Sequence, residues 1–191
     1  MEKLKLVKPT KEYEKDAIEY IEEFSEHESK INGVGQLDLY LDNYNEWLNE
    51  LEKLRSIIPD DDIVPMETFM LIRESDNRLI GMTNIRLVLN DKLLTRGGHI
   101  GYSIRPTERR KGYNSYQLYL ALKYCLDRNI EKVLMTCDKL NLASAKTIQK
   151  SYGILENEIP DNNDSNIMVQ RYWIDTNTAI KQLTKKYDKK K

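Results

Sequence analysis

The sequence predicts an α/β (α+β) protein in which helices flank one mixed, mostly antiparallel sheet of six to seven strands. Three observations support this prediction. Apolar residues recur every three or four positions over much of residues 13–54, which is the spacing of amphipathic helices. Apolar and polar residues alternate between residues 68 and 105, as in antiparallel strands. After residue 112, helical and strand patterns follow one another in turn.

The first half of the chain supplies two helices and most of the antiparallel strands. Its predicted elements are, in order, a strand over residues 4–7, helices over residues 13–24 and 37–54, and strands over residues 68–73, 79–89 and 99–105. A polar turn at Ser75-Asp76-Asn77 joins two of the strands. The helix over residues 37–54 is predicted as continuous, because Leu, Tyr and Trp residues form an unbroken helical stripe.

The second half of the chain alternates helices and strands. Its predicted elements are a helix over residues 115–126, a strand over 133–137, a helix over 142–150, and strands over 153–156 and 167–174. The helical crossover near residue 112 is expected to make the two strands beside it parallel.

A length of 191 residues suits a single domain. We assign residues 1–174 to this domain and residues 175–191 to a helical, basic tail. The tail carries five lysines from Lys185 onward, and we expect it to fray.

Composition excludes several classes of partner. The net charge is −1, so no global field attracts nucleic acid or an anionic membrane. No apolar run approaches the ~20 residues of a membrane span, and residues 1–5 precede no signal-peptide core. We therefore expect a cytoplasmic protein without membrane contact. Cys125 and Cys137 have neither metal-ligand spacing nor a disulfide framework, so we expect no metal and interpret both as small buried residues.

The segment Arg109-Arg110-Lys111-Gly112-Tyr113-Asn114 lies between a predicted strand and a predicted helix. A helix N-terminus presents free backbone N–H groups at the positive end of the helix dipole, which favours phosphate. Gly112 lets the backbone approach an anion closely, and Ser115 can add a hydroxyl. Three successive cations oppose the dipole unless an anion binds. These residues predict a pyrophosphate site that is neither an ATP-binding P-loop nor a dinucleotide fingerprint.

This segment resembles motif A of the GNAT acetyltransferases, Gln/Arg-x-x-Gly-x-Gly/Ala. Arg109, Gly112 and Asn114 stand at its three defined positions, with Asn114 in place of a small residue. Residues 100–106 are similar to the family's fourth strand and the proline that ends it. Three further segments carry the resemblance: residues 134–138 look like the family's fifth strand, residues 141–145 like an asparagine-led helix, and residues 153–158 like the sixth strand. It covers residues 67–174 and implies a GNAT fold, whose sheet splays between strands four and five.

The resemblance implies acetyl-CoA as cosubstrate. The fourth-strand backbone at Ile104 and Arg105 would pair with the pantetheine arm, the loop would hold the pyrophosphate, and Asn141 would bond the pantetheine. The implied donor-site residues are Ile104, Arg105, Arg109, Arg110, Lys111, Gly112, Tyr113, Asn114, Ser115, Asn141 and Ser144. The Asn114 side chain would either crowd the pyrophosphate or cap the helix.

The implied reaction is direct attack of a neutral primary amine on the acetyl carbonyl in a ternary complex. It needs a base for the ammonium proton and an acid for the leaving thiolate. His99 is the candidate base, because an imidazole with a pKa of ~6.5 suits this work at neutral pH. Its alternative role is a structural hydrogen bond, and Glu67 is a second candidate base. Tyr152 is the candidate acid, or else a core residue.

Several alternatives remain open from the sequence. The acceptor is expected to be a small-molecule amine, with a peptide amine as the other option, and the family's habit suggests a homodimer. A non-catalytic acyl-CoA-binding or sensor protein on the same fold is the alternative function, because Asn114 departs from the motif and residues 148–149 lack the family's tyrosine. A nucleic-acid-binding role for Arg105 and residues 109–111 is disfavoured by the near-neutral charge.

Overall fold

The computed structural model describes residues 2–161 and 164–188. Its strands are β1 (Leu4–Val7), β2 (Met66–Arg73), β3 (Arg78–Arg86), β4 (Ile100–Ile104), β5 (Lys132–Asp138), β6 (Ile154–Pro160) and β7 (Met168–Asp175). Its α-helices are α1 (Glu14–Glu26), α2 (Tyr44–Leu54), α3 (Asp91–Thr95), α4 (Tyr113–Asp127), α5 (Leu142–Lys150) and α6 (Thr176–Tyr187). The predicted class and number of strands are confirmed. Within the described ranges, no helix combines the length and the apolar character needed to cross a membrane.

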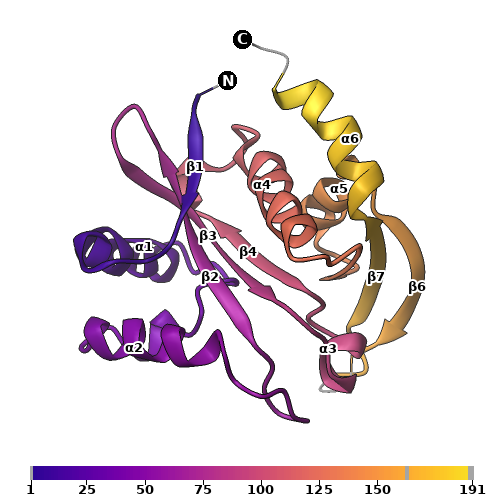
Figure 1. Ribbon diagram of the computed structural model, residues 1–191, viewed down its shortest axis with the longest axis horizontal. Coiled ribbons are helices and arrows are strands. Elements are labelled where there is room, and N and C mark those ends of the chain that lie inside the picture. The colour runs from indigo at the N-terminus through magenta and orange to yellow at the C-terminus, as the bar shows by residue number, and fades with distance from the viewer. Residues whose placement is uncertain (1, 162–163, 189–191) are drawn as a thin grey trace.

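The strands form two sheets in which all the pairs are antiparallel. Their orders are β1-β2-β3-β4 and β5-β7-β6. Helices α1 and α2 cover one face of the first sheet, and α4 packs against its other face (Figure 1). Helix α6 follows β7 and packs against α4.

Two apolar cores lie on opposite faces of the first sheet. The core under α1 and α2 includes the buried side chains of Tyr20, Phe24, Leu37, Trp47, Met70 and Met82. The core under α4 includes those of Ile85, Ile100, Leu118, Leu122, Val133, Tyr172 and Leu183. This second core draws residues from both sheets and from α4, so it packs the two sheets together.

The sheet opens between β4 and β5, as the family resemblance implied. The strands expected to run parallel, β4 and β5, do not pair with each other: among the described residues, one isolated antiparallel bridge joins Gly98, which precedes β4, to Met135 of β5. Gly98 has a φ of +62°, and a Cβ there would lie 2.3 Å from the Leu134 carbonyl oxygen. The chain therefore turns at this contact, and β4 continues as the edge of its own sheet.

The helices of the first half of the chain differ from the prediction in two places. The helix predicted over residues 37–54 is a 3₁₀ turn at Leu37–Leu39 followed by α2, because the Asn43 side chain caps a new helix by accepting from Glu46 N. Helix α3 was not predicted, and Asn90 caps it in the same way.

The C-terminal tail is helical, as predicted, but it is packed over Thr176–Tyr187 rather than frayed. Ala179 and Leu183 are buried in the core under α4, and the Tyr119 hydroxyl donates to the Asp188 carboxylate (2.9 Å). Residues 189–191, which carry three of the five lysines, lie outside the described residues. The division between a domain of residues 1–174 and a tail stays a prediction.

Candidate active site between the two sheets

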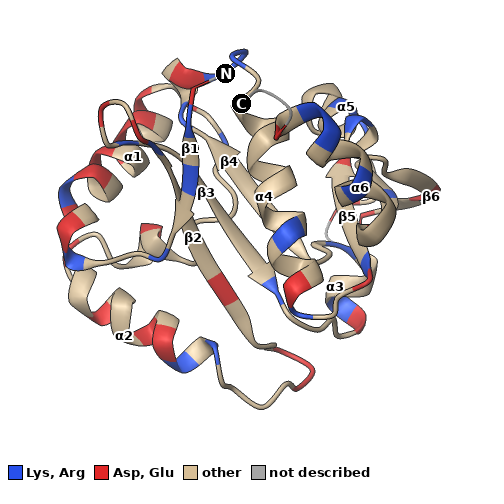
Figure 2. Cartoon of the chain, turned by 45° about the horizontal axis from the view of Figure 1, so that its top comes forward, with Lys and Arg blue, Asp and Glu red and all other residues tan. Residues whose placement is uncertain are grey.

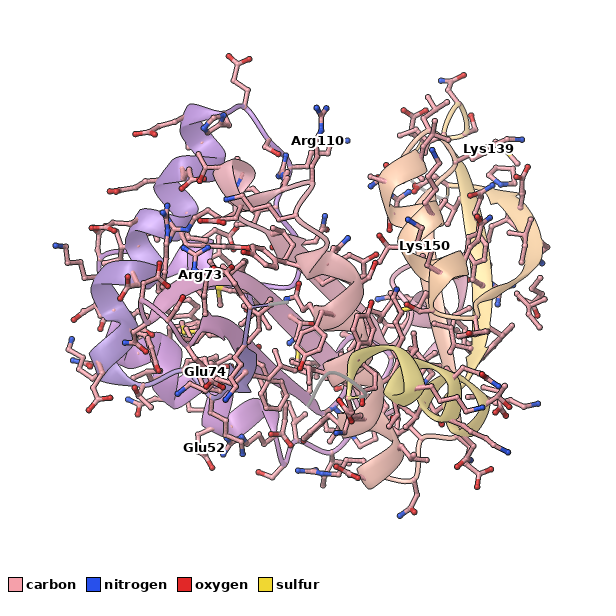
Figure 3. The ribbon with its side chains drawn as sticks, turned by 90° about the horizontal axis from the view of Figure 1, so that it is seen from above. Glu52, Arg73, Glu74, Arg110, Lys139 and Lys150 are labelled. Atoms are coloured by element: carbon pink, nitrogen blue, oxygen red, sulfur yellow. The ribbon has the colours of Figure 1, made fainter. Side chains whose placement is uncertain are left out.

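A cleft of about 870 Å³ opens where β4 and β5 diverge. We name its sides the loop wall (residues 100–115) and the α5 wall (residues 135–150). Residues 29–30 and 32–33, together with Arg86 and Arg96, also contribute to its lining. Figure 3 shows Arg110 and Lys150 on opposite sides of the opening. The volume is in the range of about 300–1,000 Å³ that small-molecule and cofactor sites occupy.

The N-terminus of α4 opens onto this cleft. Gly112 is its N-cap residue, with φ +85°, and Arg110 also has a positive φ of 63°. No side chain caps this helix, and its first turn holds no acidic residue. Its first N–H groups are therefore available to an anion. A Cβ on Gly112 would meet nothing within 4 Å, so the backbone conformation alone favours glycine at this position.

The structure brings most of the predicted donor-site residues together. Those that line the cleft are Ile104, Arg109, Arg110, Gly112, Tyr113, Asn114, Ser115, Asn141 and Ser144. Lys111 and Arg105 do not line it. The Lys111 ammonium donates to Glu108 (2.7 Å), and the buried Arg105 guanidinium pairs with Glu23 (2.9 Å).

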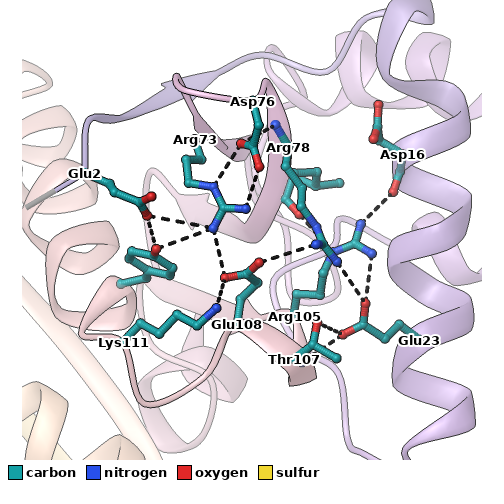
Figure 4. A network of polar contacts seen from close by, with 12 residues as sticks. Glu2, Asp16, Glu23, Arg73, Asp76, Arg78, Arg105, Thr107, Glu108 and Lys111 are labelled. Carbon is teal, nitrogen blue, oxygen red and sulfur yellow. Dashed lines mark hydrogen bonds and ion pairs between the residues drawn. The ribbon is translucent and has the colours of Figure 1, made fainter.

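A network of charged groups supports the loop wall from behind (Figure 4). Glu108 accepts from Lys111 and from Arg73, which lies 3.0 Å away. Glu23 accepts from Arg105 and from both the backbone N–H and the hydroxyl of Thr107. Burial raises the pKa of Glu23, but these hydrogen bonds outweigh it and leave the pKa below its ordinary value. The network ties α1 and β2 to the turn that precedes the loop.

Asn114 does not cap α4, which was one of its two predicted roles, and crowding of the pyrophosphate by its side chain stays a prediction. Its Nδ2 donates to the Thr147 hydroxyl (3.2 Å), which in turn donates to the Ala143 carbonyl. The side chain therefore links α4 to α5 across the cleft. Gly112, two residues earlier, is the N-cap.

The asparagine-led helix is confirmed as α5. The Asn141 side-chain oxygen accepts from Ser144 N (3.1 Å) and caps the helix. The Ser144 hydroxyl also lies 3.1 Å from that of Tyr102 on the loop wall. Burial raises the pKa of Tyr102 to about 12, so this phenol stays protonated at neutral pH.

His99 is buried at the closed end of the cleft and does not line it. Its Nδ1 accepts the N–H of Leu134 (2.9 Å), and burial lowers its pKa to about 4. The neutral imidazole has one lone pair, and this hydrogen bond uses it. The geometry thus favours a structural hydrogen bond over the predicted role as a base.

Glu67 and Tyr152, the other candidates for proton transfer, also lie outside the cleft lining. Glu67 is buried and pairs with Arg128 (2.8 Å) and Lys8 (3.2 Å). Tyr152 is half-exposed at the end of α5, with a φ of +67°. Neither side chain therefore faces the cleft in which a thioester would bind.

Sequence reasoning missed several residues of the cleft. Tyr102 and Cys137 face it from β4 and β5, and Lys146 and Lys150 from α5. The two lysines stand four positions apart in the helix that Asn141 starts, and this spacing could have placed them on the cleft face. Burial raises the pKa of the Cys137 thiol to about 11, which opposes a thiolate nucleophile in the cleft.

A family model for the acetyltransferase (GNAT) domain matches residues 3–151. The chain belongs to the GNAT acetyltransferase family. It is therefore an acetyltransferase, and acetyl-CoA is the cosubstrate of its family. No curated protein matches the chain.

Solved structures of acetyltransferases share this fold. The spermidine/spermine N-acetyltransferase SpeG from Vibrio cholerae is 14% identical, with 94% of this chain and 99% of that chain covered and a TM-score of 0.61. The microcin C7 self-immunity acetyltransferase MccE, solved with acetyl-CoA and AMP, is 13% identical over 90% of this chain and 91% of its own (TM-score 0.65). RimL, a ribosomal alpha-N-protein acetyltransferase solved with coenzyme A, is 14% identical over 90% and 93% (TM-score 0.62).

Proposed function

We propose that this acetyltransferase transfers the acetyl group of acetyl-CoA to a primary amine of a small molecule, by direct attack in a ternary complex. The observation that carries the proposal is the cleft itself. The N-terminus of α4, which no side chain caps, opens onto one end of the cleft between the two sheets. Basic side chains lie on both walls of this cleft. A diphosphate and an extended thiol arm need such an arrangement.

The donor-binding groups would act as follows. The N–H groups at Gly112 and Tyr113 would bind the pyrophosphate, with Arg109 and Arg110 adding positive charge on the same wall. Lys146 and Lys150 face them and make no ion pair with any described residue, so they are free to bind further phosphate oxygens. Asn141 and Ser144 would contact the pantetheine arm.

An acyl-enzyme is disfavoured in this cleft. Cys137 is a neutral thiol at neutral pH, and the carboxylates that line the described part of the cleft, Glu108 and Asp138, are both ion-paired. Direct attack by the unprotonated amine needs no protein nucleophile. We propose that the ammonium proton of the acceptor passes to solvent, because His99 has no free lone pair.

Tyr102 replaces Tyr152 as our candidate proton donor to the leaving thiolate. Its hydroxyl faces the cleft beside Ser144, and burial keeps it protonated. Tyr152 lies at the far end of α5 and outside the lining. The sequence-based homodimer stays a prediction.

Release of free thiol from acetyl-CoA, measured with a panel of primary amines, tests the proposed function. We expect amine-dependent release, and Tyr102→Phe should lower kcat about tenfold or more while leaving the Kd for acetyl-CoA near that of the wild type. Tyr152→Phe is the matched control and should leave kcat unchanged. Tight binding of acetyl-CoA without thiol release from any amine would favour the alternative, a non-catalytic acyl-CoA-binding protein. Equal kcat values in the two variants would remove Tyr102 from the mechanism.

A further inference from the structure

Arg86, the last residue of β3, is a partly buried cation in the cleft without a carboxylate partner among the described residues. Its NH1 donates to the backbone oxygens of Gly98 (3.2 Å) and Gly97 (3.4 Å). Within the described part of the chain, its Nε and NH2 groups make no hydrogen bond to protein. These two donors are therefore left for a molecule in the cleft.

The other arginines that are buried near this cleft are compensated by acids. Arg73 pairs with Asp76 (2.6 Å) and Glu108 (3.0 Å), and Arg105 pairs with Glu23 (2.9 Å). Burial lowers the pKa of Arg86, yet an arginine side chain stays cationic at neutral pH. A partly desolvated charge that lacks an opposite charge is unfavourable, and a bound oxyanion would remove that cost.

Arg86 lies at the opposite end of β4 from the pyrophosphate loop. Its backbone N–H donates to the His99 carbonyl, just before β4 begins, whereas the loop follows Ile104 at the end of β4. At about 3.3 Å per residue, this strand separates the two ends by roughly 16 Å. A pyrophosphate held at Gly112 would therefore not neutralise Arg86.

Glycine backbone lies next to the guanidinium of Arg86. A Cβ on Gly101 would lie 3.8 Å from the Arg86 NH1 atom and 3.4 Å from Gly33 N. Gly33 has a φ of +76° and approaches so closely that a Cβ there would lie 2.4 Å from the Gly101 oxygen. The two glycines thus let the connection from α1 to α2 pack closely on β4 beside Arg86, which lines the cleft.

The described cleft offers no free carboxylate to a cationic acceptor. Glu108 is held by Arg73 and Lys111, and Asp138 pairs with Arg96 (2.8 Å). A polyamine would bring further ammonium groups into a lining whose acids are already paired and whose nearest unpaired charge is positive. The charge of the cleft thus disfavours polyamines and favours an acceptor with a negative group.

We propose that Arg86 binds the oxyanion of the acceptor, so that the substrate is a small primary amine carrying a carboxylate or a phosphate. This inference rests on the proposed function. A guanidinium binds either group through paired N–H donors, and it thereby places the amine of the same molecule toward the thioester.

Thiol release with matched pairs of amines tests this proposal. The carboxylate arm compares glycine, β-alanine and 4-aminobutyrate with their amides, and the phosphate arm compares phosphoethanolamine with ethanolamine. We expect kcat/KM for the best anionic amine to exceed that of its neutral partner at least tenfold. Arg86→Gln should abolish this ratio, whereas Arg86→Lys should retain part of it. Differences in amine basicity cancel, because the same ratio is measured in each protein.

Lys30→Gln is the matched control, because it removes a solvated positive charge from the rim of the same cleft. It should change the ratio less than twofold. A wild-type preference for the neutral amines or for spermidine would overturn the proposal without any variant. A ratio that survives in Arg86→Gln would also overturn it while leaving the acetyltransferase function intact. Thiol release from no amine at all would overturn the proposed function and this inference with it.

Discussion

The two walls of the cleft use their positive charges in opposite ways. Behind the loop wall, Arg73, Arg105 and Lys111 are each paired with a carboxylate (Figure 4). On the α5 wall, Lys146 and Lys150 make no ion pair with a described residue. Most cations around the loop wall therefore hold its shape, and we propose that this wall binds the donor through backbone N–H groups together with Arg109 and Arg110. We propose that the lysines of the α5 wall bind the ligand directly.

The distribution of charge over the elements fits this division. Figure 2 shows acidic bands along α1 and basic bands on α5. The acids of α1 include Glu23, which accepts from the turn before the loop. Helix α5 has no acidic residue in its sequence from Leu142 to Lys150. A near-zero net charge thus conceals a local basic patch on one wall.

Removal of Arg105 should have the largest effect, and it acts on the loop wall. Arg105→Ala would leave the buried Glu23 carboxylate without its guanidinium, which costs about 3–5 kcal/mol of unfolding free energy. Urea unfolding followed by circular dichroism measures the change. Arg110→Ala, an exposed arginine of the same wall, is the control and should stay within about 0.5 kcal/mol. Similar losses in the two variants would break the contrast between supporting and ligand-binding charges.

The next effect concerns the contact where the two walls meet. The pKa of His99 is about 4 in the folded chain, against an ordinary value of 6.5. As the pH falls through 6.5, the unfolded chain takes up a proton that the folded chain refuses until about pH 4. The unfolding free energy of the wild type should therefore fall across this window, by on the order of 3 kcal/mol.

His99→Gln should remove this pH dependence, because a glutamine oxygen can accept the Leu134 N–H and does not titrate. Equilibrium unfolding at pH 7, 6, 5 and 4 in both proteins gives the comparison. The same variant should keep kcat near that of the wild type at neutral pH. A large loss of kcat with unchanged affinity for acetyl-CoA would restore His99 as the base.

The sequence predicted the parts of the fold and site that depend on local pattern. Gly112 and the cations around it marked an anion site, because a strand, a glycine turn and a helix follow one another within a few residues. The break before α2 was also readable, since Asn43 and Glu46 have the spacing of a capping box. The continuous apolar stripe concealed it.

The remaining features depend on register and on contacts between distant segments. The role of His99 follows from the Leu134 N–H, which lies on the far side of the crossover helix. Arg86 reaches the cleft because β3 pairs with β4, and Lys111 donates to Glu108 instead of lining the cleft. A single sequence carries no direct signal for such pairings.

The smallest of the three effects distinguishes the walls directly. The double variant Lys146→Gln, Lys150→Gln should bind acetyl-CoA about tenfold more weakly, because the binding site loses two unpaired cations that would contact the ligand. Lys111→Gln is the matched control and should weaken binding less than threefold, since its ammonium is held by Glu108. Both variants should unfold at nearly the wild-type urea concentration.

Calorimetric titration of acetyl-CoA into the wild type and these two lysine variants tests the central claim, that the cleft between the sheets binds the acyl donor with two unlike walls. We predict one site per chain, an affinity that falls as the salt concentration rises, and a tenfold loss only in the double variant. Absence of binding to the wild type, or equal affinities in the wild type and the double variant, would contradict it.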